Sequence, residues 1–583
     1  MRSGTLSFAR YGRKVAVGAH PFLASLSIQR ARVDVAAMPA WIPLKVMALL
    51  LIPLAPLPYW ALGLPWCARG DLSRMPLSPL VGCALAGFYA ELALIAGLPP
   101  RATVAVLTLA SAAVGWAFAR DARIQLRETV RDWAPLYLVS VIASSVAPFP
   151  ELGDWSGDWY LLYQMGTSVM HGALPSGMLA RPPLFGAAAA PLWILGPGLI
   201  PYQMMSAVAA ASTVLATLYF IDSFWPKSPR WLLLPLLLSP FFLHNTAAAW
   251  GKLLAGGLVL AAVIEARRAR VWTCGAFFAL SVAVHEGSII WLPCVLVAFA
   301  GGQRGWRAAL RALPGLALTG LAIVGPLLLW VLFKYGLAAK VDTNPALTAR
   351  NQEPFVLKTA AVVITTFIGW APLQNLARWA RNPQRLSSVV IAKEGYWFLT
   401  SWFTTMAGTL LGLLFPFVLC WRRLRDSPIL RRLMRPAVLL SLGFALIANG
   451  ILCGYSSTEG SLQTGMAALA LGAYGLLAGA ARAAGAPAFR RMSWAMGVLG
   501  TLPWALGNLF FALGLWGSPM FRARLEARSE PDYTRVMTEH LGPLGMAAFP
   551  EVPVVALLLL LGAVWATRRA TALAPPGPQP GSA

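Results

Sequence analysis

The chain has few charged residues for its length. Charged side chains make up 12% of its 583 residues and hydrophobic ones 58%, whereas soluble domains carry roughly a quarter charged residues. This shortage excludes a large soluble enzyme domain. Apolar segments near or above the roughly 20 residues needed to cross a bilayer recur from Trp41 to Ala566. We therefore expect an all-α, polytopic transmembrane helical bundle with on the order of a dozen spans, short interfacial helices and outer loops.

Cysteine and the common catalytic motifs are also sparse. The six cysteines lie within or at the edges of apolar segments without CxxC spacing, which indicates neither a disulfide framework nor a zinc site. GxSxG, HExxH and P-loop sequences are absent. Residues 1–38 show no compact apolar core ahead of a small-residue cleavage site, so we predict no cleaved signal peptide.

Acidic residues are outnumbered by basic ones, 22 against 47, which gives a net charge of +25. In a soluble protein this excess would suggest nucleic acid, but here arginine and lysine sit mainly in short runs between apolar segments. Such runs set membrane orientation and meet anionic lipid, so we expect no nucleic-acid partner. By the positive-inside rule, five runs are predicted to be cytoplasmic: 226–230, 265–270, 303–311, 421–425 with 431–435, and 481–491.

The apolar pattern divides the chain into segments. We predict a basic N-terminal segment (1–38), N-terminal transmembrane helices (39–149), an outer acidic and aromatic loop with an interfacial helix (150–200), transmembrane hairpins (201–333), an outer loop (334–396), C-terminal transmembrane helices (397–573) with an outer loop at 517–551, and a disordered tail (574–583). The individual spans are predicted at 41–63, 79–98, 102–119, 133–149, 202–224, 312–333, 397–420, 436–454, 462–480, 492–516 and 552–567.

The orientation of the first spans stays open. Both the N-terminus and the loop 120–132 favour the cytoplasm by charge, and three intervening spans cannot satisfy both. One of these spans, such as the proline-bearing 41–63, would then be a hairpin or lie in the interface.

Between the first three basic runs lie apolar stretches of roughly 35 residues, too long for one span and short for two. Each is predicted to enter the membrane and return as a helical hairpin. The first turn carries His244, Asn245, Trp250 and Lys252, and the second carries His285 and Glu286. Both turns are expected on the non-cytoplasmic side.

The most unusual stretch is polar and rich in tryptophan, and runs from Pro148 to Pro191. Its tandem Gly-Asp-Trp sequences place Asp154 and Asp158 four residues apart, each beside a glycine and a tryptophan, Trp159 in the second copy. His171 and Arg181 follow. Such an acid can be a general base, a cation ligand or a helix cap, and a solvated loop after a helix is the non-functional alternative. The broken segment 184–199 is placed in the interface.

Counting spans puts these residues and both hairpin turns on one face. Carboxylates facing lysine, arginine and histidine suit transfer from a lipid phosphate, with a base for the acceptor hydroxyl and cations for the departing phosphate. The alternative for each turn residue is solvation by water or lipid headgroups. A carboxylate pair can also bind a divalent metal, so the sequence indicates no cofactor and leaves a metal open.

At this point the sequence resembles a family. The acidic sequence in the first large outer loop, the aromatic helix after it and RPPLFGAAAAPLW look like the integral-membrane glycosyltransferases of the GT-C superfamily, near the protein mannosyltransferase and aminoarabinose transferase branch. The resemblance covers roughly 133–310. Asp158 occupies the position of the family's acidic motif, with Gly157 where the family has a second acid, and Arg181-Pro182-Pro183-Leu184 occupies that of His-Pro-Pro-Leu.

The resemblance implies an inverting glycosyltransferase of the inner (plasma) membrane. It would move a sugar from a polyprenyl-phosphate donor to a lipid, glycan or protein acceptor on the outer, extracytoplasmic face. Asp158 and Asp154 would be catalytic, and Arg181, Lys252, His244, His285, Glu286, Trp159 and His171 would bind substrate. The alternatives are a lipid-linked glycan polymerase or ligase, which would use a large outer loop such as 334–396, and a polytopic transporter or flippase.

Overall fold

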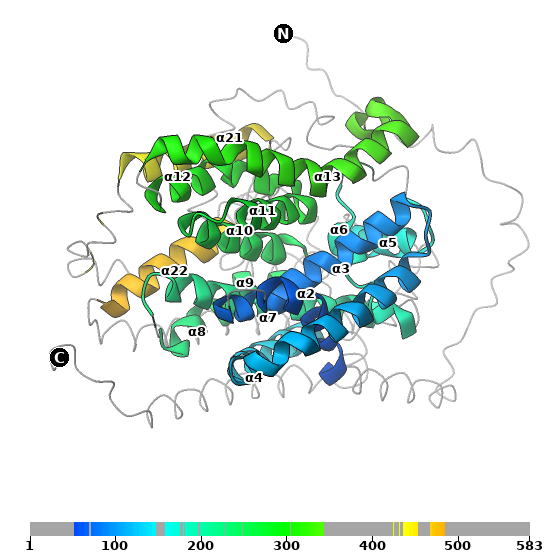
Figure 1. Cartoon of the computed structure of the whole chain (residues 1–583), viewed down its shortest axis with the longest axis horizontal. Coiled ribbons are helices and arrows are strands. Elements are labelled where there is room, and N and C mark those ends of the chain that lie inside the picture. Colours follow the sequence, from blue (N-terminus) through cyan, green and yellow to red (C-terminus); the bar gives the residue numbers. More distant parts are fainter. Residues whose placement is uncertain are drawn as a thin grey trace, which may run out of the picture. The chain divides into compact units, whose positions relative to one another are not determined.

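The structure is a computed structural model of the whole chain (Figure 1). It describes residues 52–68, 72–146, 158–174, 179, 181–195, 199–226, 228–247, 249–302, 305–342, 424, 431, 435–452 and 467–483. The predicted segments 1–38, 397–420, 492–516, 517–551, 552–567 and 574–583, and all of 334–396 after Asp342, lie outside these residues. So do the basic runs 421–425 and 431–435, apart from single positions.

Every regular element among the described residues is a helix, as the composition predicts. In chain order they are α2 (Leu57–Ala68), η4 (Leu72–Leu77), α3 (Ser78–Ile95), α4 (Pro100–Val146), α5 (Asp158–Met170), α6 (Leu184–Ala187), η6 (Leu192–Leu195), α7 (Leu199–Asp222), η7 (Arg230–Leu233), α8 (Leu234–Leu237), α9 (Pro240–Ala247), α10 (Lys252–Arg267), α11 (Val271–Val284), η8 (Glu286–Trp291), α12 (Leu292–Gly302), α13 (Trp306–Asp342), α21 (Pro436–Leu452) and α22 (Ala467–Ala483).

Three described helices are long and apolar enough to cross a membrane: Arg74–Ile95, Leu199–Asp222 and Trp306–Ala338. They contain or overlap the predicted spans 79–98, 202–224 and 312–333. α21 falls within the predicted span 436–454 and α22 overlaps the predicted span 462–480, but both are shorter apolar helices. The described residues thus establish an all-helical protein with several membrane-crossing candidates, while a dozen spans stays a prediction.

The prediction of a loop at 120–132 is wrong, because α4 runs unbroken from Pro100 to Val146. The arginines that indicated a loop are accommodated on a helix surface, where Arg127 and Arg131 are exposed. The second part of α4 packs on α7. Trp133 donates a hydrogen bond from Nε1 to Ser212 Oγ at 3.1 Å and stacks on Tyr137 at 4.8 Å between ring centroids.

Of the three long apolar helices among the described residues, α7 is the most enclosed, since its whole apolar window is buried inside the protein, against 17% of the α13 window. Its sequence explains this position. The run Ala207–Ala211 presents small side chains that let neighbouring helices approach closely, and α3, α4, α10 and α22 all pack against α7. Its hydroxyl groups bond inward, with Thr213 Oγ1 donating to the Ala209 or the Leu253 carbonyl oxygen.

The chain turns back on itself at both predicted hairpins, while their entry into a membrane stays a prediction. The first descends through η7, α8 and α9 and returns through α10, and the second descends through α11 and returns through η8 and α12. The end of α12 comes back to the end of α10, because a Cβ on Gly302 would lie 2.3 Å from the Arg267 carbonyl oxygen. Both hairpins therefore start and finish at the same end of the helices.

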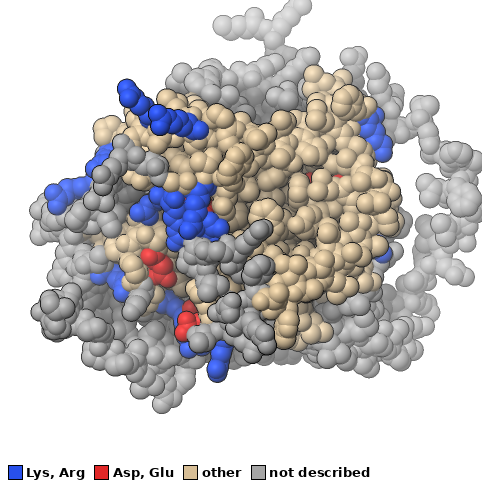
Figure 2. Space-filling model, in the orientation of Figure 1, with Lys and Arg blue, Asp and Glu red and all other residues tan. Residues whose placement is uncertain are grey.

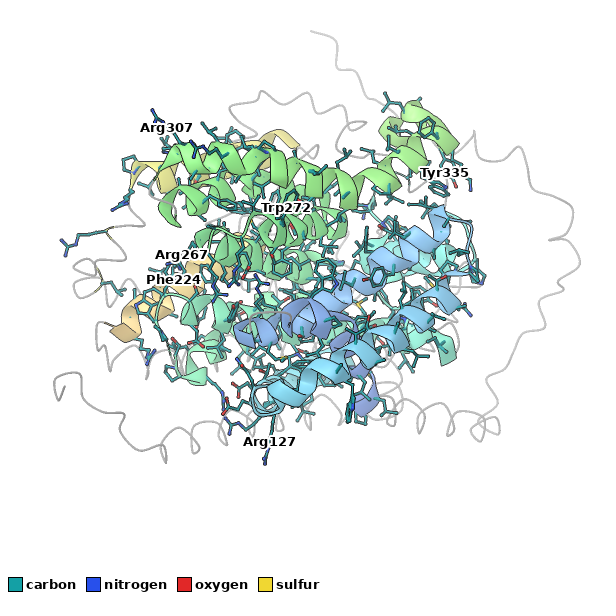
Figure 3. All side chains as sticks on the ribbon, viewed as in Figure 1. Arg127, Phe224, Arg267, Trp272, Arg307 and Tyr335 are labelled. Atoms are coloured by element: carbon teal, nitrogen blue, oxygen red, sulfur yellow. The ribbon has the colours of Figure 1, made fainter. Side chains whose placement is uncertain are left out.

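Three of the five basic runs that were predicted to share a side gather at this end. The Arg267 guanidinium lies 3.6 Å from the centre of the Phe224 ring, and these two side chains are adjacent in Figure 3. Arg482 Nη1 donates to Ser228 Oγ at 3.1 Å. Figure 2 shows lysine and arginine concentrated on one part of the visible surface, beside a broad area without charge.

A buried acid lies beneath this end. Glu265 is fully buried and its carboxylate lies near three arginines, with Arg74 at 2.5 Å, Arg268 at 3.3 Å and Arg270 at 3.5 Å. We call these four residues the basic-end cluster. It joins η4, which directly precedes α3, to the end of α10 and the residues after it. Glu265 of the run 265–270 therefore has a structural role that the pattern of basic loops does not reveal.

Candidate functional site

The polar turns of both hairpins lie at the end of the helices opposite to the basic-end cluster. α10 begins at Lys252 and ends at Arg267, which at the helical rise separates the two by about 22 Å. On α7, Tyr202 and Tyr219 are about 26 Å apart by the same rise. These spacings approach the roughly 30 Å hydrocarbon thickness of a bilayer. The predicted separation of polar turns from basic runs is therefore present in the fold.

The segment Arg181–Gly186 lies at the centre of this polar end. Two prolines precede α6, where Pro183 occupies the N-cap position. Leu184 and Phe185 are buried, as are Ala187–Ala190 and Trp193. Segment 184–199 was expected in the membrane interface. The structure buries Leu184–Trp193 among helices, because alanines and a glycine allow close packing on several sides, while Ile194 is exposed. The position of the segment relative to the membrane stays a prediction.

Two glycines allow α5 to lie directly on α6. A Cβ on Gly186 would lie 2.0 Å from the Leu162 carbonyl oxygen, and one on Gly166 would lie 2.4 Å from the Gly186 carbonyl oxygen. A side chain at either position would separate the two helices. The helix that begins at Asp158 is therefore held against the segment that follows Arg181.

Aromatic side chains connect these helices to α7. Tyr202 packs edge-on against Tyr163 at 5.7 Å and against Phe185 at 6.0 Å between ring centroids. Its hydroxyl donates a hydrogen bond to the Ala249 carbonyl oxygen at 2.8 Å. Tyr202 thus joins α5 and α6 to the turn that precedes Lys252.

Both hairpin turns reach the same place. A Cβ built on Gly251 would lie 3.1 Å from Phe185 and 3.2 Å from Val284. Gly251 precedes Lys252 and Val284 precedes His285. The predicted convergence is therefore present at the level of the chain segments: Arg181–Phe185, the turn at Lys252 and the turn at His285 meet around Gly251. We call this meeting point the Gly251 junction.

Lys252 is the best-defined candidate side chain at the junction. It is only 6% exposed and its Nζ lies 3.6 Å from the centre of the Trp250 ring. It is also the first residue of α10, where backbone N–H groups point outward and the helix dipole is positive. The Lys252 ammonium and the positive end of the helix dipole would both attract an anion, so this arrangement suits a phosphate.

The other predicted substrate-binding residues differ in their positions. Arg181 is partly buried ahead of α6. His285 is partly buried in extended backbone between α11 and η8, and Glu286 after it is exposed. His171 is exposed, and its Nδ1 lies 2.7 Å from the Thr167 carbonyl oxygen. This bond to the last turn of α5 gives His171 a local capping role.

The acidic motif is described only in part. Asp158 is the first residue of α5, where a carboxylate is favoured by the helix dipole whatever its function. For Asp158, Trp159 and His244 the structure describes the backbone position alone, and Asp154 lies outside the described residues. Their catalytic and binding roles stay predictions.

Within the described part of the chain, no group of three or more His, Cys, Asp or Glu side chains is placed to hold a metal ion. The side chain of Asp158 is not among the groups this finding covers. This finding therefore does not test a metal site at the tandem Gly-Asp-Trp sequence.

Sequence reasoning missed Glu91. It is the one acidic or basic side chain between Ser78 and Ile95, and it is 2% exposed. It lies one turn beyond Gly87, whose Cβ would come 2.2 Å from the Leu184 carbonyl oxygen. A single acid in an apolar span is the signal that would have found it, since ionisable groups in such spans are functional candidates by default.

Comparisons of the chain with protein-family models, with curated proteins and with solved structures give no match. The class that the described residues define is an all-helical protein with helices long and apolar enough to cross a membrane and a polar junction at the end opposite to its basic runs.

Proposed function

We propose that the protein is a glycosyltransferase of the plasma membrane that moves a sugar from a polyprenyl-phosphate donor to an acceptor on the extracytoplasmic face. The observation that carries this proposal is the Gly251 junction. It brings the Arg181 segment and both polar turns together at the end away from the basic runs. That is the end where a lipid-linked donor would present its phosphate and sugar.

In the proposed reaction the phosphate is the leaving group. The acceptor oxygen attacks the anomeric carbon and forms a new bond there, while the bond from that carbon to the phosphate oxygen breaks and the configuration inverts. The acceptor proton passes to the Asp158 carboxylate as general base. The departing polyprenyl phosphate carries negative charge in a poorly solvated place and needs cations.

Lys252 and Arg181 would supply those cations. Lys252 is buried at the first residue of α10, so its ammonium and the helix N-terminus would act on the same anion. Arg181 lies on the segment that contacts Gly251 through Phe185. Both groups would bind the phosphate more strongly as its charge develops, which is the requirement for lowering the barrier.

The test is transfer by purified protein in proteoliposomes that contain a panel of polyprenyl-phosphate sugars. Lys252→Ala should weaken transfer by about 2 to 4 kcal/mol in the barrier, the scale of a lost oxyanion donor. Lys252→Arg should restore part of it. Lys334→Ala is the matched control, because Lys334 is an exposed lysine on α13 that packs on Trp330.

Each rival function has its own outcome in the same assay. A flippase would move the donor across the bilayer without releasing free polyprenyl phosphate, and a polymerase would give a ladder of products. Equal transfer rates in wild type and Lys252→Ala at matched protein levels would exclude Lys252 from the site. An absence of transfer from every donor in the wild type would contradict the proposed function.

A further inference from the structure

Glu91 is a buried acid whose chemistry the fold does not use. It lies four residues before the end of α3 and is 2% exposed. Its Oε1 is buried and has no hydrogen-bond partner within the described residues. Buried carboxyl oxygens in native proteins nearly always have a hydrogen-bond partner, because an unpaired one has lost its hydrogen bonds to water and gained none in the protein.

Packing alone does not account for this residue. Its neighbours on α3 are apolar side chains and glycine, and an apolar side chain of similar volume would fill the same space at lower cost. A group that is expensive to bury and has no partner in the described fold is expected to meet one in a bound molecule. Glu91 is therefore a candidate for ligand binding.

The helix geometry directs Glu91 to the candidate site. Residues four apart lie on the same face of a helix, so Glu91 shares a face with Gly87. A Cβ on Gly87 would lie 2.2 Å from the Leu184 carbonyl oxygen, and α3 packs against both α6 and α5. Figure 1 shows the end of α3 beside these two helices. The carboxyl is thus on the face of α3 toward the Arg181–Leu184 segment.

The charge at the site decides which part of a ligand it suits. Lys252 and Arg181 supply positive charge suited to a phosphate, whereas a carboxyl group supplies none in either protonation state. Sugar hydroxyls donate and accept hydrogen bonds, and so does a carboxyl group, whose two oxygens can bind neighbouring hydroxyls together.

We propose that Glu91 binds hydroxyl groups of the sugar carried by the lipid-linked donor. This inference rests on the proposed function, and it assigns recognition of the sugar to α3, separately from the cations that bind the phosphate. No bond is made or broken at Glu91. Its contribution is affinity for the sugar and selection among sugars.

The experiment compares the thermal stability of detergent-purified protein with two probes, polyprenyl phosphate and a panel of polyprenyl-phosphate monosaccharides. The wild type should be stabilised by polyprenyl phosphate, and further by at least one sugar-bearing lipid. Glu91→Leu should fold with equal or greater stability and respond to polyprenyl phosphate normally. Its affinity for the sugar-bearing lipid should fall at least 10-fold, to the level of polyprenyl phosphate. Glu91→Gln should be intermediate.

Cys83→Ala is the control, because Cys83 is another buried residue of α3 and lies two turns earlier. It should keep the full response to the sugar. An unchanged sugar response in Glu91→Leu would overturn the inference and leave the proposed function standing. Failure of every lipid probe to stabilise the wild type would instead contradict the proposed function, and the inference with it.

A second measurement needs no variant, in case Glu91→Leu does not fold. A lipid-soluble carbodiimide adds the O–H of a buried carboxylic acid across one of its C=N bonds, so no other reactant is required. Mass spectrometry of wild-type protein should find the adduct on Glu91, and the sugar-bearing lipid should protect the residue more than polyprenyl phosphate does. Equal labelling with both lipids, or an unlabelled Glu91, would overturn the inference.

Discussion

Arg74 Nη2 lies 2.5 Å from Oε2 of Glu265, and this ion pair joins η4 to the end of α10 at the basic end. Arg268 and Arg270 complete the cluster around the same fully buried carboxylate. A buried charge is tolerated when several partners surround it, but removing one member leaves the others without compensation. The contact is therefore a sensitive point of the fold, far from the candidate site.

Glu265→Ala should destabilise the protein by about 3 to 5 kcal/mol, because it leaves Arg74 buried without its partner. A fall in the apparent melting temperature of detergent-purified protein measures this. Glu128→Ala, which removes an exposed acid from α4, should change the melting temperature little. Equal melting temperatures for the two variants would contradict the structural role of the basic-end cluster.

Gly87→Ala should separate α3 from α6, since the new Cβ would lie 2.2 Å from the Leu184 carbonyl oxygen. Overpacking of this kind costs about 1 to 3 kcal/mol, and we expect loss of transfer activity together with lower stability. Gly320→Ala is the matched control, because its Cβ on α13 would meet nothing within 4 Å. That change should be neutral or stabilise the helix by up to about 1 kcal/mol. Full activity in Gly87→Ala would remove α3 from the site.

The two ends of the molecule should face opposite sides of the membrane. In a background without native cysteines, a cysteine at the exposed Ala173 should react with an impermeant maleimide in right-side-out vesicles. A cysteine at the exposed Arg307, which lies at the start of α13 (Figure 3), should react only after permeabilisation. The reverse pattern would place the candidate site in the cytoplasm and exclude an extracytoplasmic donor.

Sequence predicted the helical hairpins well because length and charge constrain them directly. Roughly 35 apolar residues between two basic runs leave little choice except entry and return, and the end of α12 does return to Arg267. The same reasoning failed at 120–132. Arginine there indicated a loop, yet arginine is also a good helix former, and α4 continues through the region.

The candidate site was predictable as a meeting of segments and not as a set of contacts. Span counting placed Arg181, Lys252 and His285 at one end, but the glycines that let the chains touch, Gly186 and Gly251, act only through their three-dimensional neighbours. The local contact of His171 was also not predicted, since its Nδ1 lies beside a carbonyl oxygen of its own helix; its binding role stays a prediction. Glu91 was not predicted, because the candidate residues were taken from polar loops and turns and Glu91 is a lone acid within an apolar span.

Transfer of a labelled sugar from a polyprenyl-phosphate donor by purified Asp158→Asn and Asp154→Asn variants decides the role of the acidic motif. A general base contributes about 100-fold to 10,000-fold, and asparagine keeps the size of aspartate without its basicity. We predict that Asp158→Asn loses transfer on this scale while donor binding is unchanged, and that Asp154→Asn is milder. If only Asp154→Asn is inactive, the base lies in the first Gly-Asp-Trp copy; full activity in both variants would contradict the proposed glycosyl transfer.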